Sequence, residues 1–216
     1  MVKFKKVTST YKKNTGIFNI NFEVESGQMI FVMGPTGAGK STILKALYKD
    51  IQIDSGEVFL DNENITFCSK KKTSSVRRKI GMIFQDFKLL NDRTVFENIA
   101  LPLRIEGENY FDIKNKVKDV LSKIDLSGIE SSYPLELSGG EQQRVCIARA
   151  LVKNPKVILA DEPTGNLDPN ISDEILDLLE FCTDDGASVL MSTHNFPLIK
   201  PRNKKFIELN KGRIVL

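Results

Sequence analysis

Hydrophobic residues follow different patterns in different parts of the chain, and each pattern predicts a type of element. In the first third, short segments rich in β-branched and aromatic residues alternate with Gly, Asn and Ser, which is typical of strands joined by turns. A helix is predicted to begin after Lys40, because Ile43, Leu44 and Leu47 recur at helical spacing. The predicted strands here are Lys3–Val7, Phe18–Val24, Met29–Met33 and Glu57–Leu60.

The pattern becomes helical between about residues 85 and 133. Thr94 and Glu97 have the spacing of an N-cap and an N3 residue in a capping box, which predicts a helix start. Beyond them, apolar residues at i, i+4, i+7, i+8 and i+11 mark one face of another helix: Ile113, Val117, Val120, Leu121 and Ile124. We therefore expect a helical insertion over residues 85–133, with the rest of one domain formed by 1–84 and 134–216.

Helices and strands alternate in the last third of the chain, which predicts an α/β sheet with helices on its faces. The predicted order is a helix over about Gly140–Val152, a strand at Val157–Asp161, a helix near Ile171–Cys182, a strand at Ser188–Ser192, and a hairpin of Phe206–Leu209 with Arg213–Leu216.

Composition leaves this globular picture unchanged and excludes several classes of protein. The 216 residues are 41% hydrophobic and 27% charged, which is ordinary for a folded domain. The longest apolar runs are far shorter than a membrane span, and the basic N-terminus is followed by no apolar signal region. We therefore expect a soluble cytosolic chain. A net charge of +3, from 31 basic and 28 acidic residues, is too balanced to indicate nucleic-acid binding.

Cysteine and histidine usage limits the possible chemistry further. Cys68, Cys146 and Cys182 are odd in number and widely separated, so they form neither a disulfide framework nor a CxxC metal pair. We expect them to be reduced, small hydrophobic residues. The single histidine, His194, excludes multi-histidine metal sites.

A glycine-rich loop follows the predicted strand Met29–Met33 and opens the first helix. Its sequence satisfies G-x-x-x-x-G-K-[ST], in which backbone N–H groups surround a phosphate at a helix N-terminus. Lys40 would reach the β- and γ-phosphates of a nucleotide, and the Ser41 hydroxyl would bind Mg²⁺. The expected phosphate-binding residues are Gly34, Pro35, Thr36, Gly37, Ala38, Gly39, Lys40, Ser41 and Thr42.

Two adjacent acids end the predicted strand at Val157–Asp161. In proteins with a phosphate loop, an Asp at such a strand end holds Mg²⁺, which suits Asp161. The neighbouring Glu162 could polarise an attacking water, which favours hydrolysis over transfer. Without the phosphate loop, an acidic turn before Pro163 would explain the pair equally well.

A second glycine turn, Leu137–Gln143, again places glycines at a predicted helix start. Ser138 has the character of an N-cap, and Gly139 and Gly140 could form a second phosphate cradle. From this turn alone, an ordinary capped helix is the simpler interpretation.

The phosphate loop, the Leu-Ser-Gly-Gly-Glu-Gln-Gln turn and the acidic strand end, in this order, resemble the ATP-binding cassette (ABC) ATPases over essentially the whole chain. The turn matches that family's signature and is highly specific. The resemblance implies a P-loop NTPase fold: a RecA-like core with an antiparallel β subdomain, and a helical subdomain inserted at 85–133. It also implies ATP and Mg²⁺ as ligands, and ATP hydrolysis as the activity.

The resemblance assigns roles to further residues. It implies that Tyr11 stacks on adenine, that Gln85 senses the γ-phosphate and Mg²⁺, and that His194 is the switch histidine. Asp168 would lie in a loop that crosses to a partner subunit. Each has an alternative: Tyr11 could be a surface aromatic residue, Gln85 a polar strand end and His194 a structural residue.

The family's mechanism places ATP between the phosphate loop of one subunit and the signature of another. One chain carries one copy of each, so a homodimer would complete two sites. The resemblance then implies that Glu162 polarises the water, His194 contacts the γ-phosphate, and Ser138, Gly139 and Gly140 hold that phosphate from across the interface. It also implies Ser41, Gln85 and Asp161 as the Mg²⁺ ligands.

Within the family, residues 81–104 are similar to the FtsE group of bacterial cell-division ATPases. That resemblance implies an FtsX-like integral membrane partner, a peripheral location on the cytoplasmic face of the cell membrane, and control of peptidoglycan hydrolases. The segment 160–168 also fits lipoprotein-release and macrolide-export ATPases, which remain the main alternative. A soluble DNA-repair or translation ABC protein fits less well, because the chain has neither a second cassette nor long insertions. A non-hydrolysing ATP clamp is disfavoured by Glu162 and His194.

Two surface features have open interpretations. Phe87, Leu89, Leu90 and Phe96 could dock a helix of the membrane partner or could pack within the insertion. The basic residues at 70–72 and 77–79 indicate a solvated face or a contact with anionic lipid.

Overall fold

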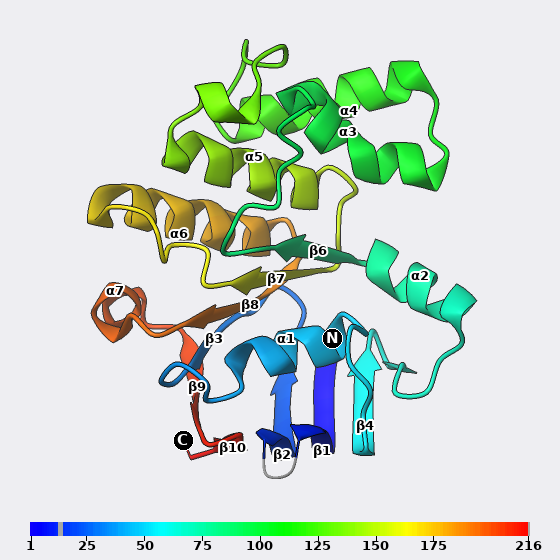
Figure 1. Ribbon diagram of the computed structural model, residues 1–216, viewed down its shortest axis with the longest axis vertical. Helices are drawn as coiled ribbons and strands as arrows, with labels where there is room; N and C mark the ends of the chain where they lie inside the picture. Colours follow the sequence, from blue (N-terminus) through cyan, green and yellow to red (C-terminus); the bar gives the residue numbers. More distant parts are fainter. Residues whose placement is uncertain (13–14, 216) are drawn as a thin grey trace.

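Two β-sheets and a group of helices are stacked along the long axis of the molecule (Figure 1). The computed structural model describes residues 1–12 and 15–215, so Leu216 of the predicted hairpin lies outside the described residues.

The strands are β1 (Val2–Lys12), β2 (Thr15–Val24), β3 (Met29–Met33), β4 (Ser55–Leu60), β5 (Glu63–Asn64), β6 (Ile80–Ile83), β7 (Val157–Asp161), β8 (Ser188–Thr193), β9 (Lys205–Asn210) and β10 (Arg213–Ile214). The helices are α1 (Lys40–Leu47), α2 (Lys70–Arg78), α3 (Val95–Glu106), α4 (Tyr110–Lys123), α5 (Gly139–Leu151), α6 (Pro169–Asp184) and α7 (Phe196–Ile199), with 3₁₀ turns at Pro134–Glu136 and Lys200–Arg202.

The central sheet has six strands in the order β10-β9-β3-β8-β7-β6, and its five strands from β9 to β6 are parallel. Every residue of β3 is buried, as expected for a parallel strand covered on both faces. Ile30 and Val32 join one core cluster, whereas Met29, Phe31 and Met33 join another. This alternation follows from the two-residue period of a strand, and it leaves the carboxyl end of β3 free to start the phosphate loop.

The second sheet is antiparallel, in the order β2-β1-β4-β5, and lies at the opposite end of the molecule from α3 and α4 (Figure 1). Its strand β1 is longer than predicted. Register shifts interrupt its pairing with β2, and Lys6 has a φ of 51°. These bulges break the strict alternation of apolar residues, which is why the sequence pattern recognises only part of the strand.

Three core clusters hold the layers together. One lies between α1, the antiparallel sheet and the central sheet, and a second packs α5 and α6 on the other face of the central sheet. The third joins α3, α4 and α5 and includes the whole predicted helical face: Ile113, Val117, Val120, Leu121 and Ile124. The predicted capping box at Thr94 and Glu97 is confirmed.

Helix α2 was not predicted as a helix. Val76 is its only buried hydrophobic residue among those described, so no apolar stripe marks it in the sequence. Its start is set by Ser69, whose side chain accepts a hydrogen bond from the Lys72 amide.

The proposed docking residues divide into two kinds. Leu89 and Phe96 are half-buried against the third core cluster, which favours packing within the insertion. Leu90 is 42% exposed, and Phe87 is half-buried. Among the described helices, none is both long and apolar enough to cross a membrane.

Candidate active site

The phosphate loop connects the end of β3 to the start of α1. Gly34, Gly37 and Gly39 have φ values of 142°, 79° and 105°, which L side chains rarely adopt. At Gly34 the loop also passes close to β9, since a Cβ atom there would lie 2.3 Å from the carbonyl oxygen of Leu209. The first turn of α1 has no acidic residue and no side-chain cap, so its N–H groups and positive potential favour an anion.

Lys40 begins α1 with its side chain folded over the loop. The ammonium group donates to the carbonyl oxygens of Gly34 (2.8 Å) and Pro35 (3.3 Å), and lies 3.2 Å from Glu162 Oε1. The Lys40 side chain is only 7% exposed. A positive charge is therefore fixed at the centre of the loop.

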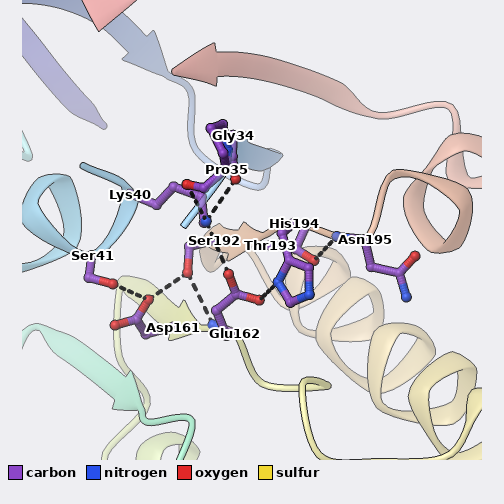
Figure 2. A network of polar contacts seen from close by, with 10 residues as sticks. All are labelled: Gly34, Pro35, Lys40, Ser41, Asp161, Glu162, Ser192, Thr193, His194 and Asn195. Atoms are coloured by element: carbon purple, nitrogen blue, oxygen red, sulfur yellow. Dashed lines mark hydrogen bonds and ion pairs between the residues drawn. The ribbon is translucent and has the colours of Figure 1, made fainter. Parts of the chain in front are cut away.

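Asp161 ends β7 and accepts hydrogen bonds from two hydroxyl groups (Figure 2). Ser41 Oγ donates to Asp161 Oδ1 at 2.9 Å, and Ser192 Oγ donates to the same oxygen at 2.6 Å. Ser192 reaches it because β7 and β8 are parallel neighbours in which Asp161 pairs with Ser192.

Glu162 follows with a φ of 48°, a conformation that is uncommon for a residue with a side chain. Its amide donates to the carbonyl oxygen (3.1 Å) and the hydroxyl (3.0 Å) of Ser192, which hold the turn. Its Oε2 lies 2.7 Å from His194 Nδ1, and its Oε1 faces Lys40, as Figure 2 shows. One carboxylate thus lies between an ammonium group and an imidazole.

Lys40, Ser41, Glu162 and His194 line a cavity of about 410 Å³, whereas Asp161 and Ser192 are not among its lining residues. It brings together the phosphate loop and four residues that are distant in sequence, which are the predicted Tyr11, Gln85, Glu162 and His194. The remaining lining residues are Thr15, Gly16, Thr36, Gly37, Gly39, Lys40, Ser41 and Thr42.

Four predicted site residues lie elsewhere. Ser138, Gly139, Gly140 and Asp168 are not among the described residues that line this cavity. Ser138 is exposed and caps α5, donating to Glu141 Oε2 at 2.6 Å, and Asp168 caps α6. The two helix starts are neighbours, because Cβ atoms at Gly139 and Gly140 would lie 3.6 Å from Leu167 and 2.9 Å from Ile171. The signature turn and Asp168 therefore form a separate, outward-facing cluster.

The sequence interpretation missed Ser192, which holds Asp161 and Glu162 together. Its only signal is its place in a strand beside β7, because a parallel neighbour ends at the same edge of the sheet. The described residues contain no cluster of three or more His, Cys, Asp or Glu side chains suited to a metal ion.

The sequence matches the family described as ABC transporter over residues 17–165. The chain belongs to this ABC family. It is 42% identical to proteins named cell division ATP-binding protein FtsE from Streptococcus pneumoniae, covering all of this chain and 94% of that protein, and from Escherichia coli K12, covering 99% and 97%.

Solved structures of the family have the same fold. The cassette MJ0796, described as a dimeric bacterial ABC transporter cassette, superposes with a TM-score of 0.88 at 34% identity, covering all of this chain and 97% of that one. The protein cbiO1 from Clostridium perfringens, described as part of the ABC transporter complex cbiONQ, gives a TM-score of 0.92 at 26% identity, covering 100% of this chain and 86% of that one. This ABC protein therefore has the cassette fold, and it is an ATP-binding and ATP-hydrolysing enzyme.

Proposed function

We propose that this ABC ATPase is the ATP-driven subunit of a bacterial membrane complex that acts in cell division. The observation that carries the proposal is the full-length similarity to relatives named cell division ATP-binding protein FtsE, at 42% identity in Streptococcus pneumoniae, Bacillus subtilis and Escherichia coli. Those relatives are matched over 94–97% of their own length, so the similarity covers whole proteins rather than a shared motor domain.

The cavity supports specific roles in hydrolysis. ATP would bind with its phosphates on the loop at 34–42, with Lys40 neutralising the β- and γ-phosphates and Tyr11, which is 51% exposed at the rim, stacking on adenine. Glu162 is the general base that takes a proton from the attacking water. His194, which lies against the Glu162 carboxylate, orients that base and contacts the γ-phosphate, and Gln85, which lines the same cavity, senses that phosphate.

The residues around Asp161 fit a magnesium ion. Mg²⁺ prefers oxygen ligands and commonly binds through one or two protein groups plus phosphates and water, so a larger acidic cluster is not required. Ser41 Oγ and Asp161 Oδ1 are 2.9 Å apart at the edge of the loop, and Gln85 lines the same cavity. When bound, the ion neutralises charge on the β- and γ-phosphates. Ser41, Asp161 and Gln85 would hold it.

A homodimer would complete the site. In the cluster of Ser138, Gly139, Gly140 and Asp168, every residue except the half-buried Gly140 is exposed. The cluster lies outside the chain's own cavity, so it is available to a nucleotide on a second copy. Ser138 and the glycines would supply a capped helix start to the γ-phosphate. The related cassette MJ0796 is described as dimeric, including a post-hydrolysis state bound to ADP and Pi, which supports this arrangement.

The membrane component would be an FtsX-like integral membrane protein, which would keep this chain on the cytoplasmic face of the cell membrane. Purification of the tagged chain from native membranes, followed by mass spectrometry, tests this proposal. We expect an FtsX-like subunit to co-purify and depletion of the chain to block division. Recovery of a lipoprotein-release or macrolide-export membrane subunit, with normal division on depletion, would contradict the cell-division role.

A further inference from the structure

Arg149, in the last turn of α5, holds the loop that follows Gln85. Its guanidinium donates to two successive main-chain carbonyl oxygens, those of Phe87 (Nη2, 2.7 Å) and Lys88 (Nη1, 2.6 Å). The thiol of Cys146, on the adjacent turn of the same helix, donates to the Phe87 carbonyl oxygen at 3.0 Å. Three hydrogen bonds from one helix thus converge on two peptide groups.

The backbone conformation of Phe87 and Lys88 requires contacts from outside the loop. Phe87 and Lys88 both have left-handed backbone conformations, with φ values of 59° and 53°. Consecutive left-handed residues with side chains are unfavourable and persist where surrounding contacts impose them. Inside the loop itself the bonds are short-range turns, from the Phe87 amide to Phe84 and from the Lys88 amide to Asp86.

The contact partly buries the charged guanidinium group of Arg149, which is unfavourable for the charged form. It is half-buried, and its partners are neutral carbonyl groups rather than a carboxylate, so burial lowers the pKa of Arg149. Its planar fork matches two carbonyl oxygens at once, which the single ammonium group of a lysine cannot do in the same geometry.

The loop that Arg149 contacts is directly continuous with Gln85 in the nucleotide cavity. Gln85 lines the nucleotide cavity and is separated from Phe87 by one residue, so the path of its backbone depends on the turn that Arg149 fixes. On the far side of the turn, buried Asn98 of α3 binds the amide and the carbonyl oxygen of Leu90 (2.8 and 3.0 Å). The segment after Gln85 is therefore tied to two helices.

We infer that Arg149 is a positioning residue that fixes Gln85 at the wall of the nucleotide cavity by clamping the two carbonyl groups of Phe87 and Lys88. The inference rests on the proposed role of Gln85 in hydrolysis. The same helix begins at the signature turn, so the clamp also connects the surface proposed to meet the second copy with the γ-phosphate sensor of this chain.

The test compares Arg149→Gln with a matched variant, Arg77→Gln. Arg77 also donates to two successive carbonyl oxygens, those of Tyr48 and Lys49 (both 3.0 Å), but at the far end of α1 from Lys40. Arg77 also pairs with Asp50 at 3.6 Å and lies over the Tyr48 ring, so its loss removes the same pair of carbonyl contacts and two further ones. Only the loss of Arg149 should affect Gln85.

We expect Arg149→Gln to lower kcat for ATP hydrolysis roughly tenfold or more. The Kd of a fluorescent ATP analogue should stay within about threefold of the original chain, because the phosphate loop is untouched. Hydrogen exchange of the peptide spanning residues 84–90 should become faster. Arg77→Gln should keep kcat and the exchange of that peptide, and Arg149→Lys should recover part of both. If Arg149→Gln fails to fold, Arg149→Lys carries the comparison.

An equal loss of kcat in the two glutamine variants, an unchanged kcat in Arg149→Gln, or a loss of nucleotide affinity that accounts for the lower rate would overturn the inference. Failure of the proposed role of Gln85 is distinguishable, because Gln85→Ala would then keep the kcat of the original chain. Hydrogen exchange still tests the clamp in that case: faster exchange at 84–90 supports it, and unchanged exchange overturns it.

Discussion

The ammonium group of Lys40 lies 3.2 Å from Glu162 Oε1, and the two side chains are only 7% and 13% exposed. They come from the start of α1 and from the turn after β7, 122 positions apart in the chain. Phosphate groups on the loop would compete with Glu162 for the same ammonium group. Nucleotide binding would therefore change the contacts of the ammonium group that lies beside the proposed base.

Replacement of that base should separate binding from turnover. We expect Glu162→Gln to lower phosphate release by at least about 100-fold, because an amide cannot take the proton of the attacking water. ATP affinity should be kept, and the variant should accumulate as an ATP-bound dimer in size-exclusion chromatography with light scattering. A Glu162→Gln chain that stays monomeric with ATP and hydrolyses it at the normal rate would rule out this role.

Lys40→Ala should remove nucleotide binding itself. The substitution deletes the charge proposed to neutralise the phosphates, together with two hydrogen bonds to the loop carbonyls. A thermal melt with and without ATP measures this, since a bound ligand raises Tm by mass action. We expect the ATP-dependent increase in Tm to disappear. A variant with the same increase as the original chain would contradict the assignment.

Ser192→Ala should impair hydrolysis without contacting the nucleotide. Its hydroxyl donates to Asp161 and accepts from the Glu162 amide, so its loss loosens both acids. Changes of this kind, one step from the reacting groups, typically cost about 10- to 100-fold in activity. Ser188→Ala is the control, because Ser188 is buried in the same strand but donates to Glu25 at the opposite end. Equal rates in the two variants would show that Ser192 positions neither acid.

Two glycines of the phosphate loop should differ in their tolerance of alanine. A Cβ atom at Gly34 would lie 2.3 Å from the Leu209 carbonyl oxygen, whereas one at Gly37 meets nothing within 4 Å. We expect Gly37→Ala to reduce the free energy of unfolding by about 1 kcal/mol, through its left-handed backbone alone. Gly34→Ala should cost more than about 2 kcal/mol, because the loop and β9 must also move apart. Urea titrations measure both, and similar losses would argue against the contact with β9.

The buried thiols should resist alkylation. Burial raises the pKa of Cys146 to about 12 and that of Cys182 to about 11, whereas Cys68 is only half-buried. Intact-mass measurement after iodoacetamide treatment at pH 8 should therefore show modification at Cys68 alone, and at all three after unfolding. Rapid native modification of Cys146 would show that α5 opens readily.

The raised pKa of Cys146 also has a consequence for stability. Above an ordinary thiol pKa of 9.0 the unfolded chain ionises at this residue while the folded chain does not, so alkaline pH favours unfolding. The stability advantage of the original chain over Cys146→Ala should be constant below pH 9. It should then shrink by about 1.4 kcal/mol per pH unit up to about pH 12. An advantage that stays constant between pH 8 and 10.5 would contradict the shift.

Local sequence patterns were sufficient to predict the features that depend on residues adjacent in the chain. The phosphate loop, the capping box at Thr94 and the buried strand Val157–Asp161 are contiguous patterns, and the structure has them at the predicted places. Tyr11, Gln85 and His194 come from three different segments. The resemblance to a family indicated their roles, and the structure shows that all three line one cavity.

Contacts between distant segments could not be predicted from local patterns. Ser192 reaches Asp161 only because β8 lies beside β7. Arg149 reaches the Phe87 carbonyl oxygen only because α5 lies beside the turn after β6. Helix α2 lacks an apolar stripe and depends on its cap and on Val76, so periodicity does not indicate it. Each of these features depends on the arrangement of elements in space.

The position of β3 between β8 and β9 also has a consequence for synthesis of the protein. This strand carries the phosphate loop, is made early, and gains its two neighbours only from residues 188–210. The loop is further fixed by the hydrogen bond from Gly212 to Ala38. A chain emerging from the ribosome therefore cannot make all the contacts that fix this loop until translation has passed residue 212.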